Sequence, residues 1–254
     1  MARRVQRLAE QAGALASRAP DVVALQEVTV RTWPLWQAAL TTIGLPHVAW
    51  STSRPRRTGV LLASRTPAAG AQPLPVPWPE TTLAREIDGV VFHTVHVPNA
   101  ANGWIKIETL EAVRAGLAAT SGARVLCGDL NTPRRETPDG TVLSFARDTR
   151  GRLREERGER WDAGELGVVP GLADLGFADA LRTLHGYARP ERSWTFANQK
   201  GGWRLDHVFA SRELEVLAAG YHHGWRAAGL SDHAPFEADL RLRPAPGAPA
   251  PPGA

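Results

Sequence analysis

The chain has 254 residues, and its 43% hydrophobic content is enough to bury the core of one large α/β domain. Cys127 is the single cysteine, so an intramolecular disulfide is excluded and no oxidising compartment is required. The absence of a run of about 18 apolar residues argues against a membrane span. The net charge is +4 and is carried mostly by arginine, which suits a polyanionic partner but also fits a solvated Arg/Glu surface, so charge alone decides nothing.

The first quarter of the chain alternates between helix-like and strand-like segments. Residues 1–20 carry apolar side chains at helical spacing and no long apolar core, so we predict an amphipathic helix and not a targeting sequence. Residues 22–28, VVALQEV, predict a fully buried strand. Glu27 stands where this strand ends, at the mouth of a cleft or, alternatively, at the start of a solvated loop. A helix over 32–43 and strands over 47–51 and 58–64 follow.

The next segments predict a hairpin, a helix and a second buried strand. A Pro-rich connector over residues 67–80 precedes a hairpin that turns at Asp88-Gly89. His96 lies near the end of the hairpin's second strand, where an isolated histidine is more often packed than catalytic. A helix over 104–119 leads into residues 123–131, ARVLCGDLN. Asp129 and Asn131 flank one leucine at the end of this strand and therefore face the same side.

The C-terminal half carries two Asp-His neighbours. Asp206 and His207 lie in a predicted strand, where alternation points them to opposite sides, so only one of them should reach a site. Asp232 and His233 lie in a loop that leads into the last strand. Helices are predicted over 150–162 and 164–184, and strands over 192–196, 201–211 and the end of 229–242. Residues 1–242 predict a single layered α/β domain, and the Pro/Gly/Ala-rich residues 243–254 predict a disordered tail.

Several polar side chains at the ends of these strands suit phosphoryl chemistry if they converge. They are Glu27, His96, Asp129, Asn131, Asp206, Asp232 and His233. Oxygen donors without a cysteine or a tight histidine cluster favour Mg²⁺ or Mn²⁺ over zinc. Phosphodiester hydrolysis needs charge neutralisation, an oriented water and a protonated leaving oxygen, which carboxylates, an amide and imidazoles can supply.

The ordered motifs LQEV, HVPN, GDLN, RLDH and SDH, spread over residues 21–240, resemble the endonuclease/exonuclease/phosphatase superfamily. The resemblance implies a four-layered α/β sandwich, with two packed β-sheets flanked by helices, and a Mg²⁺-dependent phosphoesterase. SWTF followed by GGWRLDHVFAS is most similar to the exonuclease III/apurinic-apyrimidinic endonuclease branch.

The same resemblance implies roles for nine residues. Asp129 would orient or deprotonate the attacking water, and Asn131 would hold the scissile phosphate. Asp206 would orient His233, which would contact that phosphate, so the pairing crosses two strands and leaves His207 a packing or secondary residue. The remaining roles are metal binding by Glu27 with Asp232 beside the metal, leaving-group protonation by His96, a phosphate contact from Asn99, and a nucleotide pocket lined by Trp203, for which core packing is an equal alternative.

Two departures from the branch pattern stand out. His96 occupies a position where the branch usually has tyrosine, which puts abasic-site specificity in doubt. The family normally begins with a strand ending in Trp-Asn, whose asparagine helps to bind metal, and the present sequence starts at the helix after it. We therefore expect upstream coding sequence to encode that strand, because its loss would expose the neighbouring strands and remove part of the metal shell.

The sequence thus predicts a Mg²⁺-dependent phosphodiesterase that cleaves DNA as an endonuclease or exonuclease, in DNA repair, with Mn²⁺ as an alternative metal. Two other functions stay open: a phosphoesterase acting on phospholipid headgroups or small phosphate esters, and a catalytically impaired binding module. We expect a cytoplasmic monomer with DNA as its partner and no implied protein partner.

Overall fold

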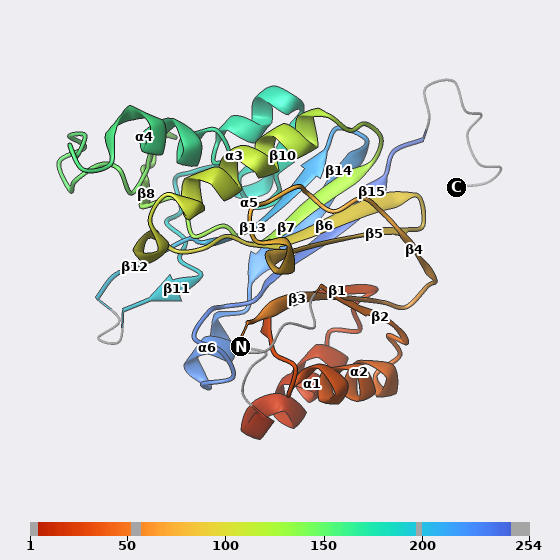
Figure 1. Cartoon of the computed structure of the whole chain (residues 1–254). Helices are drawn as coiled ribbons and strands as arrows, with labels where there is room; N and C mark the ends of the chain where they lie inside the picture. Colours follow the sequence, from red (N-terminus) through yellow and green to blue (C-terminus); the bar gives the residue numbers. More distant parts are fainter. Residues whose placement is uncertain (1–4, 52–56, 197–199, 245–254) are drawn as a thin grey trace.

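The computed structural model describes residues 5–51, 57–196 and 200–244 (Figure 1). Two sheets dominate it. The smaller sheet has the order β1-β3-β2, and the larger has the order β10-β13-β7-β6-β5-β4. Their strands are β1 (Val22–Val28), β2 (His47–Trp50), β3 (Gly59–Ser64), β4 (Ala68–Gly70), β5 (Thr82–Ile87), β6 (Val90–His96), β7 (Arg124–Asp129), β10 (Phe177–Asp179) and β13 (Asp206–Ser211).

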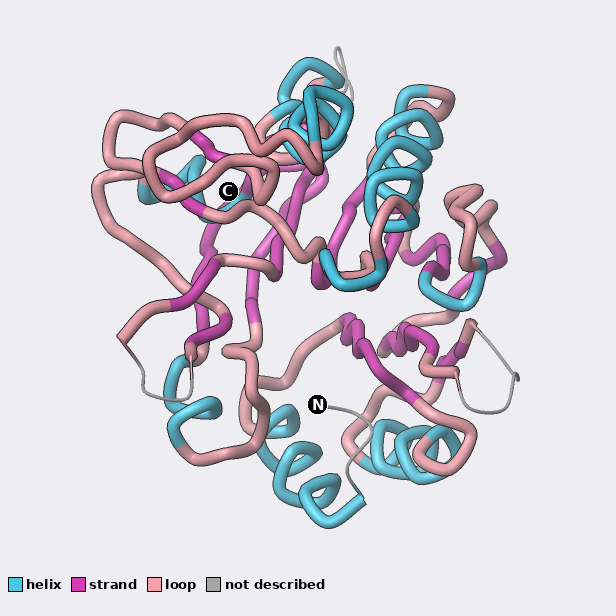
Figure 2. The backbone as a smooth tube through the Cα atoms, turned by 60° about the vertical axis from the view of Figure 1, so that its left-hand side comes forward, coloured by secondary structure: helices cyan, strands magenta, loops and turns pink. Residues whose placement is uncertain are grey.

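The outer face of the smaller sheet is covered by α1 (Leu8–Ala16) and α2 (Trp33–Thr42), which pack Trp36 and Leu40 against Val23 and Leu61. The outer face of the larger sheet is covered by α3 (Ile105–Ala118) and α4 (Gly158–Leu166), where Ile107 and Leu110 belong to the same core as Leu126 and Phe209. Figures 1 and 2 show the strands lying between these helices.

The inner face of the larger sheet packs against the smaller sheet in one apolar cluster and against a hairpin in another. Val60 and Leu62 of the smaller sheet pack with Leu83 of the larger one. The hairpin of β14 (Leu214–Tyr221) and β15 (Phe236–Leu242) packs on the same inner face, with Leu214 against Val125 and Ala210. The order is therefore helices, sheet, sheet, helices, and the predicted four-layered α/β sandwich is confirmed.

Strand register gathers polar residues at one edge of the larger sheet. β6 runs parallel to β7 and pairs His96 with Asp129, and the crossover between them contains α3. β13 runs antiparallel to β7 and pairs Asp206 with Asp129. The last residues of β6 and β7 and the first residue of β13 therefore lie side by side.

Two predicted helices differ from the structure. Within 150–162 the helix begins only at Gly158, because Arg147 bridges to Leu153 and the Asp148 side chain accepts hydrogen bonds from the backbone of the intervening turn. The predicted helix over 164–184 is interrupted after Leu166. Pro170 lacks the N–H that a continuing helix needs, and the following residues form a 3-10 helix (Gly171–Leu175), β10 and α5 (Ala180–His185).

Short elements complete the described chain. They are β8 (Arg135–Glu136), β9 (Val142–Leu143), β11 (Trp194–Thr195), β12 (Gly202–Trp203), α6 (His223–Ala227), and 3-10 helices over Val5–Arg7, Pro79–Thr81 and Ala100–Asn102. None of the helices in the described part of the chain combines the length and the apolar surface needed to cross a membrane. Residues 245–254 of the predicted disordered tail lie outside the described residues.

Candidate active site

Gly128 allows β6 and β7 to approach closely where both strands end. Its φ is +136°, and a Cβ at this position would lie 2.0 Å from the carbonyl oxygen of Val95. Only glycine therefore fits at position 128. The close approach places the buried Asp129 beside His96, with 3.8 Å between Oδ2 and Nε2.

Asn131 turns back toward Asp129, as the sequence predicts. Its backbone N–H donates to Asp129 Oδ1 at 2.8 Å, and its Nδ2 donates to the Val97 carbonyl at 2.7 Å and to Asp129 Oδ2 at 3.3 Å. The φ of Asn131 is +50°, a left-handed conformation that asparagine tolerates better than most residues. The intervening Leu130 is fully buried, so the two polar side chains share one face.

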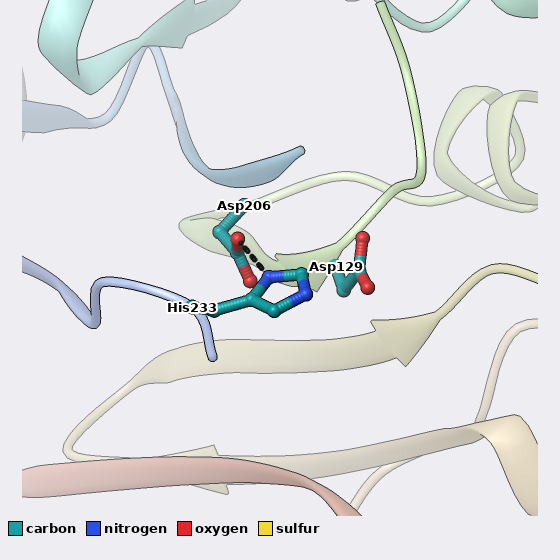
Figure 3. Close-up of side chains that lie close together, drawn as sticks. All are labelled: Asp129, Asp206 and His233. Carbon is teal, nitrogen blue, oxygen red and sulfur yellow. Dashed lines mark hydrogen bonds and ion pairs between the residues drawn. The ribbon is translucent and has the colours of Figure 1, made fainter. Parts of the chain in front are cut away.

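Asp206 and His233 form a hydrogen-bonded dyad. His233 Nδ1 lies 2.7 Å from Asp206 Oδ2, which leaves Nε2 of the imidazole turned toward Asp129 (Figure 3). The buried Ser193 hydroxyl accepts hydrogen bonds from the N–H groups of Leu205 and Asp206, and its carbonyl accepts one from Ala234. These contacts fix the start of β13 relative to the loop that carries His233.

His207 takes no part in this dyad. It is buried, and its Nε2 lies 2.8 Å from the carbonyl oxygen of Thr132. The alternation of β13 therefore sends Asp206 into the site and His207 away from it. The pairing across two strands matches the geometry that the sequence suggests, and the sequence neighbours Asp206 and His207 do not pair.

Burial and mutual charge perturb the titration of this group. Burial, followed by the nearby Asp206 carboxylate, raises the pKa of Asp129 to about 7. Burial opposes the charged form of His233, but the Asp206 carboxylate outweighs it and raises the pKa of the imidazole to about 10. The same pairing outweighs burial at Asp206 and lowers its pKa, whereas burial lowers the pKa of His96.

Glu27 and Asp232 border this group. Glu27 lies at a register shift in β1 and has a φ of +62°, a strained conformation for a glutamate. Its charge opposes the lowering of the His96 pKa by burial and adds to the rise in the pKa of Asp129, so its carboxylate acts on the site. Asp232 is exposed, and its charge raises the pKa of His233.

The donor set fits a hard divalent cation. One potential ligand atom from each of Asp129, Asp206 and His233 lies within 4.8 Å of the others. Glu27, Asp129 and Asp206 contribute three carboxyl groups beside the imidazoles of His96 and His233, and oxygen-rich sites of this kind suit Mg²⁺. Within the described residues, the compact group consists of side chains that the sequence assigns to catalysis, with Glu27 and Asp232 outside it.

Residues 1–233 match the profile of the Endonuclease/Exonuclease/phosphatase family. The chain belongs to this family. Family membership supports a hydrolase of the nuclease or phosphoesterase type, and such enzymes generally depend on divalent metals.

Solved structures of the endonuclease/exonuclease/phosphatase family share the fold of this chain. An AP endonuclease from Archaeoglobus fulgidus superposes with a TM-score of 0.74 at 22% identity, covering 94% of this chain and 96% of its own. A 3′ phosphatase from Neisseria, bound to a product DNA hairpin, gives 0.69 at 24%, covering 94% and 95%. An endonuclease/exonuclease/phosphatase from Beutenbergia cavernae gives 0.60 at 20%, covering 93% and 66%.

The two residues that the sequence assigns to substrate binding lie in different surroundings. Asn99 is exposed, and its Oδ1 caps the 3-10 helix after β6 by accepting from Ala101 N at 3.1 Å. Trp203 stacks on Trp194, with ring centroids 5.0 Å apart, and meets Phe196 edge-on at 4.9 Å. A β-bridge between Trp194 and His233 joins this aromatic cluster to the dyad. Trp203 is therefore packed within the cluster and also close to the site.

Three buried residues near the site are not predicted from the sequence. Ser193 holds β13, Lys106 donates to the Asn131 carbonyl at 2.8 Å, and Glu165 pairs with Lys106. Lys106 carries the clearest signal that could have found it, because it is one of two lysines in an arginine-rich chain and lies next to the apolar stripe of a predicted helix. Ser193 and Glu165 show no comparable pattern.

Proposed function

We propose that this protein is a Mg²⁺-dependent phosphodiesterase that hydrolyses DNA phosphodiester bonds, as an endonuclease or exonuclease in DNA repair. The observation that carries the proposal is the Asp206–His233 dyad, 2.7 Å across, facing Asp129 at the edge where three strands meet. DNA as the substrate is supported by the structural neighbours, which are described as an AP endonuclease and as a 3′ phosphatase bound to DNA. In this proposal the enzyme acts as a cytoplasmic monomer.

The dyad supplies a fixed positive charge for the scissile phosphate. Because Asp206 holds Nδ1 and raises the pKa of the imidazole to about 10, His233 is cationic near neutral pH and presents Nε2 as a donor. Asn131 is proposed to hold the phosphate by exchanging its long Nδ2 contact with Asp129 Oδ2, at 3.3 Å, for one with a phosphate oxygen. Preorganised donors of this kind stabilise the charge that develops on the phosphoryl oxygens.

Asp129 is the proposed base or orienting group for the attacking water. Burial, followed by the Asp206 carboxylate, raises its pKa to about 7, and a general base is most effective when its pKa lies near the pH of the reaction. His96 is the proposed donor to the leaving oxygen. It lies 3.8 Å from Asp129 on the neighbouring parallel strand, which places both groups within reach of the same phosphate.

Glu27 and Asp232 are the proposed metal residues. Glu27 contributes a hard oxygen donor whose charge acts on Asp129, and Asp232 adds negative charge next to His233. A bound Mg²⁺ would offset the charge of the phosphate and activate water. Asn99 is proposed to contact a flanking phosphate, and Trp203 is proposed to line the nucleotide pocket, where an indole can stack on a base or sugar.

A nuclease panel tests the proposal. Purified protein is incubated with plasmid, abasic-site and 3′-blocked DNA, in Mg²⁺ or in EDTA. Wild-type protein should cleave only with Mg²⁺, and Asp129→Asn should lower kcat by about 10²–10⁴-fold. Asp174→Asn is the matched control, because Asp174 is an exposed carboxylate paired with Arg114 away from the site. Metal-independent cleavage, or full activity in Asp129→Asn, would contradict the proposal.

The alternative functions predict different results in parallel assays. Hydrolysis of phosphoinositides or sphingomyelin, with DNA left uncleaved, would favour a phosphoesterase that acts on a lipid substrate. Absence of Mg²⁺ or Mn²⁺ uptake in calorimetry, together with DNA binding, would favour a binding module over an enzyme.

A further inference from the structure

Lys106 is a buried cation directly beneath the candidate site. It lies in the first turn of α3, and its side chain is 0% exposed. Its ammonium donates to the Asn131 carbonyl at 2.8 Å and to Glu165 Oε1 at 2.7 Å, and it lies 4.7 Å from the Phe145 ring centroid. A side chain of α3 thus touches the backbone of the residue proposed to hold the phosphate.

Glu165 of α4 is equally buried and uses both of its carboxylate oxygens. Oε1 accepts from Lys106 and from Trp161 Nε1 at 2.6 Å. Oε2 accepts from the Thr132 hydroxyl at 2.7 Å and from the Phe145 N–H at 2.8 Å. Four donors therefore fix the carboxylate, and one of them belongs to the residue after Asn131.

The contacts converge on two consecutive residues. Lys106 holds the carbonyl of Asn131, Glu165 holds the hydroxyl of Thr132, and His207 lies 2.8 Å from the carbonyl of Thr132. Asn131 has a φ of +50°, so its conformation depends on external contacts more than that of an ordinary loop residue. Moving the carbonyl of Asn131 would tilt its whole peptide unit and displace Nδ2 relative to Asp129.

We propose that the Lys106–Glu165 pair is a positioning device that sets the side chain of Asn131 for catalysis. Its catalytic part rests on the proposed phosphodiesterase function, in which Asn131 holds the scissile phosphate. A fully buried ion pair is weak as a source of stability, since apolar side chains of similar volume often serve a fold as well or better. The pair's direct contacts with Asn131 and Thr132 give it a role that apolar packing could not fill.

Removing both charges together tests the proposal. Lys106→Met alone would strand the Glu165 carboxylate, so the variant combines Lys106→Met with Glu165→Gln. The glutamine oxygen can still accept from Thr132 and Phe145, and because its NH2 group then faces the Trp161 Nε1–H donor, Glu165→Gln alone is the reference for that contact. We expect kcat to fall by about tenfold or more, with KM within about threefold, because the affected contact is made in the transition state. The matched control is Glu111→Gln with Arg160→Met, which removes an exposed ion pair between the same two helices and should leave kcat unchanged.

A double-mutant cycle separates positioning from general damage. Asn131→Gly removes the amide and tolerates the positive φ. Adding the Lys106/Glu165 changes to Asn131→Gly should alter kcat by less than about twofold, because the side chain that they position is absent. A further loss as large as in the wild-type background would overturn the proposal.

Hydrogen exchange provides a readout that does not depend on activity. In the free protein, the Lys106/Glu165 variant should exchange the amides of Leu130, Asn131, Thr132 and Arg134 faster than wild type, while β5 stays protected. Unchanged exchange in that segment would overturn the positioning role, even in an active enzyme. A wild-type protein that cleaves no DNA would instead refute the proposed function, and exchange would still decide whether the pair orders the segment.

Discussion

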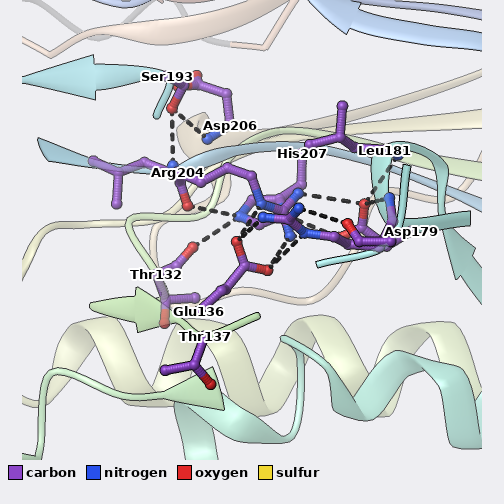
Figure 4. A network of polar contacts seen from close by, with 12 residues as sticks. Thr132, Glu136, Thr137, Asp179, Leu181, Ser193, Arg204, Asp206 and His207 are labelled. Carbon is purple, nitrogen blue, oxygen red and sulfur yellow. Dashed lines mark hydrogen bonds and ion pairs between the residues drawn. The ribbon is translucent and has the colours of Figure 1, made fainter. Parts of the chain in front are cut away.

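Two buried ionic clusters lie beneath the candidate site, and they differ in how they reach it. The Lys106–Glu165 pair is 0% exposed and contacts Asn131 directly. The second, which we call the Arg204 cluster, comprises Arg182, Arg204, Glu136 and Asp179. Figure 4 shows Arg204 between Glu136 and Asp179. The Arg204 cluster is linked to Asp206 through the backbone, since Arg204 lies two residues earlier, and through His207, whose Nδ1 lies 3.6 Å from Asp179 Oδ2.

The Arg204 cluster joins elements that are far apart in the sequence. Arg204 forms forked contacts with Glu136 of β8, at 2.6 and 2.7 Å, and with Asp179 of β10, at 2.6 and 3.3 Å. Arg182 of α5 adds a second fork to Glu136. Planar guanidinium groups bind carboxylates in this bidentate manner, which fixes relative orientation as well as distance.

The comparison distinguishes two roles of buried charges, one in the stability of the fold and one in the positioning of site residues. The Arg204 cluster ties β8, β10, α5 and the start of β13 together, so breaking it should mainly lower the free energy of unfolding. The pair ties two helices to a single pair of site residues, so breaking it should mainly lower turnover. The following variants can break or sharpen this distinction, beginning with the largest expected effect.

Arg204→Met should have the largest effect on stability. It leaves the Glu136 and Asp179 carboxylates buried without their main partner, and removing one member of a buried ionic network typically costs about 3–5 kcal/mol. Urea denaturation at pH 7 measures the change. Arg241→Met is the control, because it removes an exposed pair with Glu215 and should cost at most about 1 kcal/mol. Equal losses in the two variants would show that the cluster adds little to the fold.

Acid should weaken the same cluster over a defined pH range. Burial opposes the Glu136 carboxylate, but Arg204 and Arg182 outweigh it and lower the pKa of the carboxyl to about 2, from 4.5. Because the folded-state pKa is the lower one, the contribution is complete above pH 4.5 and is lost as the pH falls toward 2. The loss amounts to about 3 kcal/mol.

Denaturation measured at several pH values tests this contribution. The unfolding free energy of wild type should fall more steeply between pH 4.5 and 2 than that of Glu136→Gln, whose amide does not titrate in this range. Parallel pH profiles for the two proteins would rule out Glu136 as a source of the acid sensitivity.

On the side of the pair, Thr132→Val should produce an intermediate effect. Valine keeps the shape of threonine but removes the hydroxyl that donates to Glu165 Oε2 at 2.7 Å. A buried carboxylate that loses one donor costs about 1–3 kcal/mol. If the pair positions the site segment, kcat should fall as well, which a nuclease assay and a denaturation curve on the same sample can determine. A stability loss with unchanged kcat would assign Thr132 to the fold alone.

The strand ends that form the site could be predicted from the sequence. VVALQEV and VLCGDLN are apolar runs that end in polar residues, and the side-chain period of two in a strand separates Asp206 from His207. These local signals, together with the motifs of the family, predict the sandwich and the convergence of Asp129, Asn131, Asp206 and His233.

The buried ion pairs beneath the site could not be predicted from the sequence, for a physical reason. Glu165 lies 59 residues from Lys106, and Glu136 lies 68 residues from Arg204. Both glutamates stand in charged or mixed segments that read as solvated surface, because their partners arrive from other layers of the fold. The sequence also does not predict the breaks in the expected helix over 164–184, because the pairing of Phe177 with Ser211 overrides helical periodicity.

Tyr221→Phe should give the smallest effect, and it supplies the counterpart of Thr132→Val on the side of the Arg204 cluster. The Tyr221 hydroxyl donates to the backbone carbonyl of Asp206, a neutral acceptor, whereas Thr132 donates to a buried carboxylate. Loss of a hydrogen bond between neutral groups costs about 0.5–1.5 kcal/mol. Both variants remove one hydroxyl, and because the Tyr221 hydroxyl also interacts with the Arg204 guanidinium, denaturation of Tyr221→Phe reports on the Arg204 cluster as well as on the Asp206 carbonyl. A cost for Tyr221→Phe that exceeds the cost for Thr132→Val would mean that the backbone of Asp206, and not the Lys106–Glu165 pair, is the more sensitive support.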